Sequence, residues 1–266
     1  MIMPRSASAF SLVELSIVLV ILGLMTGGIL GGQALIRAAE LRSVSTEYQR
    51  WITATQTFRD KYFAIPGDMS NATMFWGFQG TAAAPGCVSN SGISAVTSTG
   101  TCDGNGNGLP GLSAAAATTG ESYQFWRQLA SAGLVEGVYS GIAGTIGPFE
   151  INAGINVPRS KMNNALWSAY FRGTQGDTRY FSANYGNAFV VGAKNGSDNN
   201  NLALFRPEEA WNIDTKMDDG KPGTGKIIGL YWNNLCATAV SNTDYASNYN
   251  LASSNPQCVL YFTNAY

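Results

Sequence analysis

Oxygen-bearing side chains alternate with glycine in one short segment of the chain. Asp103, Asn105 and Asn107 are each followed by a glycine. This spacing matches the first half of a calcium-binding loop, in which side-chain oxygens at alternate positions coordinate the ion. No acid stands at the twelfth position, so Glu121 would have to complete the site. The segment predicts either a calcium site or an Asn/Gly-rich turn held by Cys102.

A second acidic group lies nearer the C-terminus, at Asp214, Asp218 and Asp219. It predicts a solvated turn near the end of a helix, with calcium binding as the alternative. The glycine-rich segment 220–227 nearly spells a phosphate-binding loop. Because Ile227 stands where that motif needs Ser or Thr to hold magnesium, we interpret the segment as a turn that enters a strand.

The chain lacks histidine, the residue that enzymes use most often for proton transfer. No GxSxG, SxxK or HExxH motif occurs either. We therefore expect no catalytic activity and no cofactor apart from the calcium considered above, with a membrane-anchored secreted enzyme as a distant alternative. The net charge of -1 gives no general attraction for nucleic acid or anionic lipid.

The four cysteines form two local pairs along the sequence, Cys87 with Cys102 and Cys236 with Cys258. Neither pair has the short CxxC spacing that is typical of zinc and redox sites. Two disulfides formed in an oxidising compartment are the simplest interpretation, and four buried thiols are the alternative.

The longest apolar run of the chain lies near its N-terminus. Residues 15–36 contain no charged side chain, and as a helix they would be about 33 Å long, enough to cross a hydrocarbon core of about 30 Å. Arg5 is the only charge before residue 10, so the positive-inside tendency predicts a cytoplasmic N-terminus. Glu14, at the edge of the run, would cost on the order of 3 kcal/mol if deep and unpaired, so it needs a partner.

The segment from Ala9 to Glu14 resembles the processing site of the type IV prepilins, the family of type IV pilins and type II secretion pseudopilins. In that family a small residue precedes the cut and glutamate is the fifth residue after it, as here, although most members have Gly where this chain has Ala9. The resemblance implies that prepilin peptidase removes a leader of residues 1–9, cuts between Ala9 and Phe10, and N-methylates Phe10.

Such processing would supply the partner that Glu14 needs. An α-amine is cationic below about pH 8 and methylation keeps its charge, so the amine of one subunit can neutralise Glu14 of its neighbour and set the axial register. The resemblance thus implies a structural filament subunit that works with other pilin or pseudopilin subunits and an inner-membrane assembly platform. It implies a periplasmic head that becomes extracellular in the filament. A tip adhesin or a DNA-uptake minor pilin is the alternative.

Two other interpretations of the apolar run stay open. A secretory signal peptide cut near Ala34 would need an apolar segment longer than the typical 7–15 residues. An uncleaved anchor explains the length of the run but not residues 10–14 as a set.

Small residues recur within the run at a spacing that lets helices approach closely in lipid, and they also weaken the helix. The small residues at this spacing are Gly23, Gly27, Gly28, Gly31 and Gly32. A loosely packed anchor is the alternative.

Hydrophobic side chains continue at helical spacing beyond the apolar run, and no helix breaker occurs before Ile65-Pro66. One long helix is predicted from Phe10 to Ala64, within an N-terminal segment that ends at residue 65 and has residues 10–36 in the membrane or the filament core. The side chains of this stripe are Leu41, Val44, Tyr48, Trp51, Thr55, Phe58 and Tyr62, and Glu47 falls outside it.

Residues 66–266 are predicted to form a globular α+β head. A short helix is expected at residues 121–132 with Gly133 after it, and another begins at Pro207. Short strands separated by turns favour an antiparallel sheet on which the long helix packs, a pilin-like arrangement. The clearest strand candidates are residues 187–192, 202–205, 226–232 and 258–263.

Overall fold

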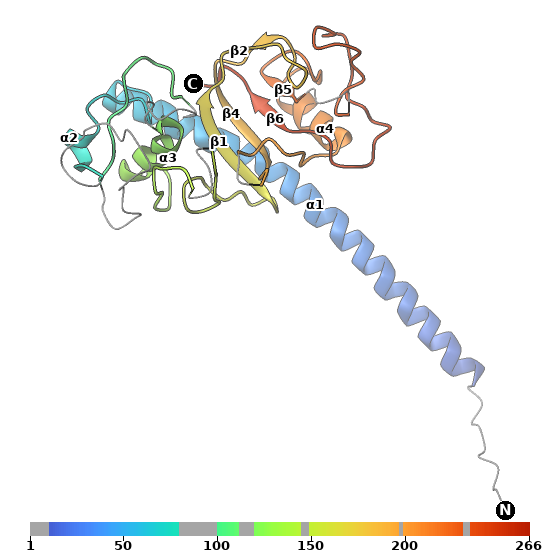
Figure 1. Cartoon of the computed structure of the whole chain (residues 1–266). Coiled ribbons are helices and arrows are strands. Elements are labelled where there is room, and N and C mark those ends of the chain that lie inside the picture. The colour runs from blue at the N-terminus through green and yellow to red at the C-terminus, as the bar shows by residue number, and fades with distance from the viewer. Residues whose placement is uncertain (1–10, 80–99, 112–119, 145–148, 197–198, 231–234) are drawn as a thin grey trace, which may run out of the picture. The chain divides into compact units, whose positions relative to one another are not determined.

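In the computed structural model, a long apolar N-terminal helix is followed along the chain by further helices and an antiparallel sheet (Figure 1). The structure describes residues 11–79, 100–111, 120–144, 149–196, 199–230 and 235–266. The chain forms two compact units, an N-terminal unit that ends at Leu41 and a C-terminal unit that begins at Arg42. Each unit is described by itself.

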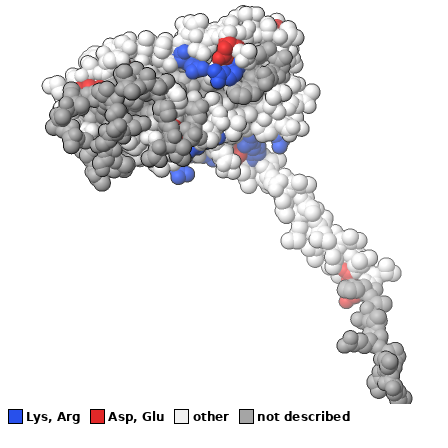
Figure 2. Space-filling model, in the orientation of Figure 1, with Lys and Arg blue, Asp and Glu red and all other residues white. Residues whose placement is uncertain are grey.

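Helix α1, Leu12–Tyr62, is the longest element of the chain. In the N-terminal unit it carries a run that is long and apolar enough to cross a membrane, and none of that run is buried. Figure 2 shows the surface of this apolar run as white, and residues 15–36 contain no Lys, Arg, Asp or Glu. The predicted apolar span is therefore a helix whose length and composition are compatible with a single-pass anchor. The helix ends two residues before the predicted Ala64, because Phe63 has a positive φ of 53°.

The C-terminal unit is built on a four-stranded antiparallel sheet with the strand order β1-β4-β6-β5. Strands β2 and β3 pair with each other in a separate short sheet. The strands are β1 (Ala165–Phe171), β2 (Thr174–Gln175), β3 (Ala183–Asn184), β4 (Asn187–Ala193), β5 (Ile227–Gly229) and β6 (Leu260–Phe262). The two long strands, β1 and β4, pair along their whole length, from Ala165 opposite Ala193 to Phe171 opposite Asn187.

One face of this sheet packs through aromatic rings against α1 and against α3 (Glu121–Ser131). The ring of Tyr48 on α1 stacks on Phe262 of β6, with 4.2 Å between the centroids. Phe189 of β4 lies 6.0 Å from Trp126 of α3, which in turn lies 5.2 Å from Trp51 of α1. The prediction that the long helix packs on an antiparallel sheet is confirmed for the part of α1 in the C-terminal unit.

The opposite face of the sheet is also buried. Tyr170, Val190 and Tyr261 project from it into a cluster that includes Phe181 and Ala237, both from connecting segments. Because both faces are covered, the central strands are apolar at almost every position and lack the alternation of a half-exposed sheet.

Several predicted elements need correction. Residues 202–205 do not form a strand of the sheet and make only isolated bridges, Leu202 to Ala193 and Phe205 to Cys258. The strand predicted at 226–232 is reduced to β5, with residues 231–234 outside the described part, and the strand at 258–263 is reduced to β6. Strands β1, β2 and β3 and helix α2 (Thr73–Trp76) were not predicted.

The predicted short helices are confirmed. Helix α3 ends one residue before the predicted Ala132, and Gly133 follows with a φ of 73° while Leu134 N donates a hydrogen bond to Leu129 O. These two features are the signature of a glycine-terminated helix. Helix α4, Pro207–Met217, begins at the predicted proline.

Candidate functional site

The start of α1 is closed by a reciprocal pair of hydrogen bonds. Ser11 N donates to Glu14 Oε2 at 2.9 Å, and Val13 N donates to Ser11 Oγ at 3.3 Å. This is a variant of the capping box, in which Ser11 bonds the N–H of Val13 rather than that of Glu14, and it satisfies backbone donors that the first turn of a helix leaves free. Glu14 therefore has a local role in the chain. The predicted processing residues, Ala9 and Phe10, lie outside the described residues.

The five glycines of the apolar run have no contact role inside the chain. A Cβ atom added at any of them would meet nothing within 4 Å, and α1 continues through them without a break. The nearby Thr26 hydroxyl donates to Leu22 O at 2.9 Å, so this polar group is satisfied within the helix. The glycine surface is thus open to a second helix, and a loosely packed anchor remains the alternative.

The segment predicted as a calcium loop wraps its backbone around a carboxylate from elsewhere in the chain. Asp68 is buried, and its Oδ1 accepts hydrogen bonds from Gly106 N at 2.9 Å and Asn107 N at 3.2 Å. Its Oδ2 accepts one from Gly108 N at 2.6 Å. Three successive backbone N–H groups that face one acid hold the segment in place, and they attract negative rather than positive charge.

The four side chains predicted to hold calcium act as hydrogen-bond acceptors for the backbone. Asp103 accepts from Thr73 N at 2.7 Å, and Asn105 Oδ1 accepts from Asn107 N at 2.9 Å. Glu121 Oε1 accepts from Asn105 N at 3.1 Å, so the structure brings these two residues together. The other predicted ligand, Asn107, accepts from Leu109 N at 2.8 Å. Calcium binding at this segment stays a prediction.

Replacing Asp68 by alanine should destabilise the C-terminal unit by about 1–2 kcal/mol, because three backbone donors lose their acceptor and only part of that loss is made good by solvent. In thermal denaturation of the full chain in detergent, this corresponds to a Tm lower by roughly 2–8 °C. Asp60→Ala is the matched control, since Asp60 is exposed and its carboxylate has no partner in the described part of the chain. Equal Tm values for the two variants would contradict the role of Asp68.

The second acidic group is drawn together at the end of α4. Within the described segments, Asp214, Asp218 and Asp219 form the one set of His, Cys, Asp or Glu side chains whose ligand atoms all lie within 4.8 Å of one another. Ile227 N donates to Asp218 Oδ2 at 2.9 Å, and Thr224 Oγ1 donates to Asp219 Oδ2 at 2.6 Å. These bonds hold segment 220–227 as a turn that enters β5, as predicted, whereas calcium binding here stays a prediction.

Asp214 differs from its two neighbours because it is fully buried. Tyr249 OH donates to Asp214 Oδ2 at 2.8 Å, and Gly220 N donates to Asp214 Oδ1 at 3.2 Å. Burial raises the pKa of Asp214 to about 7, and the charges of Asp219 and Asp218 add to the rise, although the two hydrogen bonds oppose it.

One predicted disulfide is present, between Cys236 and Cys258, with 5.0 Å between the Cα atoms. It joins the segment after β5 to the residues just before β6. Cys87 lies outside the described residues, so the predicted pairing of Cys87 with Cys102 stays a prediction. A disulfide fits a chain that folds in an oxidising compartment.

Comparisons of the chain with protein-family models, with curated proteins and with solved structures found no match. Its function is therefore argued from the chemistry of its own residues.

Proposed function

We propose that the chain is a structural subunit of a type IV pilus or of a type II secretion filament, and that it assembles through the N-terminal part of α1. The observation that carries this proposal is an apolar helical run, with none of it buried in the chain, that begins directly after an acid. Such a surface has to be covered by lipid or by other apolar helices. The membrane covers this surface with lipid before assembly, and the filament core covers it with other apolar helices afterwards.

The contacts of Glu14 support a role in assembly. Its Oε2 accepts from Ser11 N, whereas its Oε1 accepts no hydrogen bond from any of the described residues. One oxygen can thus close the helix start of its own chain while the other receives the amine of a neighbour. Cleavage after Ala9 would create that amine on Phe10, and the amine is a charge-assisted donor.

The proposal includes the partners and the location that this assembly needs. Prepilin peptidase would process and methylate the chain at the cytoplasmic face of the inner membrane. The single span would hold the C-terminal unit in the periplasm, where Cys236 and Cys258 can be oxidised. An inner-membrane assembly platform would then add the subunit to others of pilin or pseudopilin type.

Replacing Glu14 by glutamine separates its two roles. Glutamine at this position preserves the capping box but removes the charge, whereas Glu14→Leu removes both. If the carboxylate pairs with an amine, both variants should insert into the membrane normally yet give at least about tenfold fewer filaments, since 1.4 kcal/mol per contact corresponds to tenfold weaker association. Filaments are counted by electron microscopy in cells with the assembly machinery.

Normal filaments from Glu14→Gln, with few from Glu14→Leu, would show that only the cap matters. Normal filaments from both variants would refute a role for Glu14 in assembly. N-terminal sequencing of the mature chain is the independent check: a start at Phe10 is expected. A start near Ala34 would identify a secretory signal peptide, and an intact Met1 would identify an uncleaved anchor.

A further inference from the structure

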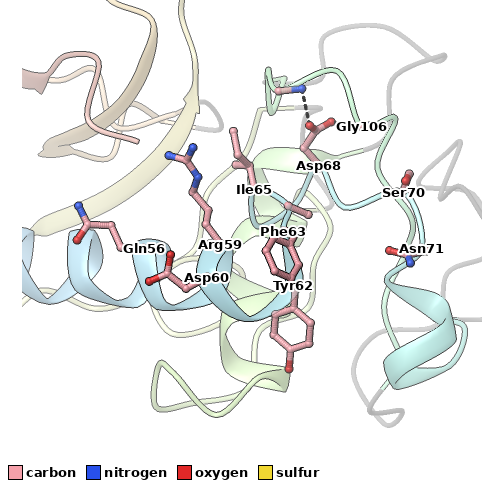
Figure 3. Close-up of a pocket in the computed structure, with 12 residues that line it drawn as sticks. Gln56, Arg59, Asp60, Tyr62, Phe63, Ile65, Asp68, Ser70, Asn71 and Gly106 are labelled. Carbon is pink, nitrogen blue, oxygen red and sulfur yellow. Dashed lines mark hydrogen bonds between the residues drawn. The ribbon is translucent and has the colours of Figure 1, made fainter.

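We propose that a pocket at the C-terminal end of α1 binds a neutral saccharide, a function that goes beyond the structural role. The pocket has a volume of about 870 Å³ and lies between the last turns of α1, the turn that follows, and the glycines that surround Asp68 (Figure 3). This volume is within the range of small-molecule sites. Among the side chains that line it are Gln56, Arg59, Asp60, Phe63, Ser70 and Asn71.

Phe63 is the least expected residue of this pocket. It has a φ of 53°, a conformation that a bulky side chain adopts with strain, and its side chain is 93% exposed. A glycine would end α1 without that strain and without an aromatic ring in water. Residues held in strained conformations cluster at functional sites, so we infer that the ring itself is needed.

Tyr62, which also lines the pocket, belongs to a cluster of aromatic rings. Tyr62 lies 5.3 Å from Phe75 and 5.2 Å from Trp76, measured between ring centroids. Its ring also lies 4.6 Å from Phe58, which is fully buried. The exposed ring of Phe63 offers a flat apolar surface, and the C–H face of a sugar ring is the complementary surface.

Polar side chains of both kinds surround this aromatic surface. Gln56, Arg59 and Asn71 offer donors, Asp60 offers an acceptor, and Ser70 can serve as either. None of these five side chains makes a hydrogen bond or an ion pair with the described residues, so all are available to a ligand. The adjacent hydroxyl groups of a saccharide each donate and accept hydrogen bonds, so they would use such a mixed set of side chains.

The charge of the pocket favours a neutral ligand over an anionic one. Among the described residues that line it, Arg59 is the only cation, whereas Asp60 and Asp68 are both acids. Because Asp68 is held by three backbone N–H groups, it is not free to bind a cationic ligand. A phosphate would meet two carboxylates for one guanidinium, so nucleic acid is the less suitable occupant.

Isothermal titration calorimetry of the full chain with maltotriose, mannotriose, galactotriose and chitotriose tests this proposal. A detergent without a sugar headgroup, such as lauryldimethylamine oxide, avoids competition. We expect at least one trisaccharide to bind with a Kd in the millimolar range or tighter. Phe63→Gly should weaken that binding about tenfold or more without lowering Tm, because it removes the ring and relieves the strain.

Phe63→Trp is the matched variant, since it keeps an aromatic face and should keep the binding. Asp60→Ala should weaken the binding with Tm unchanged. Three outcomes would overturn the proposal: no trisaccharide binds at millimolar concentration, Phe63→Gly and Asp60→Ala both bind like the unmodified chain, or an oligothymidine probe binds through Phe63 and the sugars do not.

Discussion

Replacing Glu47 by alanine is expected to lower the free energy of unfolding by about 3–5 kcal/mol, the largest single-residue effect we expect in the C-terminal unit. Glu47 lies on α1 and is only 7% exposed. Its carboxylate accepts hydrogen bonds from Lys161 N at 2.6 Å, from Ser160 Oγ at 2.7 Å and from Trp167 Nε1 at 2.7 Å. These bonds tie α1 to strand β1 and to the segment before it.

The size of this effect follows from what alanine leaves behind. The buried indole N–H of Trp167 would stay in the interior without an acceptor, at a cost of about 1–3 kcal/mol, and the partly buried N–H of Lys161 would lose its acceptor as well. The volume of the lost carboxylate would add a cavity. Thermal denaturation of the full chain in detergent should show a Tm lower by roughly 6–20 °C.

Glu136→Ala is the control for Glu47, because the side chain of Glu136 is 92% exposed and its one ion pair within the described residues, with Arg50, is 3.6 Å long. Its Tm should match that of the unmodified chain. A double-mutant cycle of Glu47→Gln with Trp167→Phe should give a coupling energy of about 1–3 kcal/mol. Additive effects in the cycle, or a Tm for Glu47→Ala equal to that of Glu136→Ala, would contradict this account.

Glu47 also shows where the helical pattern of the sequence stops being informative. The stripe correctly predicts the buried faces of Val44, Trp51 and Phe58. It places Glu47 on the polar side of the helix. This placement is wrong, since helical periodicity assigns every acid to the solvated face. The partners that bury Glu47 lie 113–120 residues further along the chain, and only the fold brings them to it.

The strands of the sheet were likewise predictable only in part. Strand β4 matches its prediction within one residue, because a run of β-branched and aromatic residues is a direct signal. Residues 202–205 are also apolar, but they contain no β-branched residue and form no matching ladder. Just before them, the side chain of Asn200 bonds Leu166 O at 2.8 Å and Val190 O at 2.9 Å. Here a side chain does part of what a strand backbone would do.

The residues of the candidate sites also divide into those with local partners and those with partners far along the chain. The capping box of Ser11 and Glu14 is local, and the pattern Ser-x-x-Glu could have predicted it. The acceptor of the Asn/Gly-rich loop, Asp68, is not local. It bonds backbone groups 38–40 residues away, and a search for calcium ligands within the loop cannot find it.

Helix α3 gives a further example, because its polar side is as buried as its apolar side. Gln128 Oε1 accepts from Gly67 N at 2.6 Å, and Gln124 Nε2 donates to Gly141 O at 2.8 Å. Arg127 Nη1 donates to Tyr139 O at 2.6 Å. These side chains position loops that carry no regular structure, so amphipathic periodicity alone misplaces them at the surface.

The stability of the C-terminal unit should fall as the pH rises from 5 to 8, through the titration of Asp214. Burial raises the pKa of Asp214 to about 7 in the folded chain, against about 3.9 for an unfolded aspartate. Between these values the folded chain binds a proton that the unfolded chain does not. The stabilisation is therefore present at pH 5 and is lost as the pH passes through 7.

Because the chain contains no histidine, no other side chain with an ordinary pKa titrates strongly in this interval. With a folded pKa of about 7, roughly 2–3 kcal/mol of stability should be lost between pH 5 and pH 8, which corresponds to a Tm lower by roughly 4–12 °C. Asp214→Asn should flatten this dependence and raise Tm at pH 8. Asparagine stays neutral in the buried position and can still accept a hydrogen bond from Gly220 N.

Glu208→Gln on the same helix is the control, since Glu208 is exposed and its variant should follow the unmodified chain at every pH. Thermal denaturation in steps of half a pH unit separates the variants. If Asp214→Asn kept the full slope, the titrating group would be elsewhere, and the buried acid at the end of α4 would be ionised in the folded chain. If the unmodified chain kept its full stability at pH 8, the conclusion would be the same. A buried carboxylate that stays charged would need a further partner, a cation or another donor, in addition to the hydroxyl of Tyr249 and the N–H of Gly220.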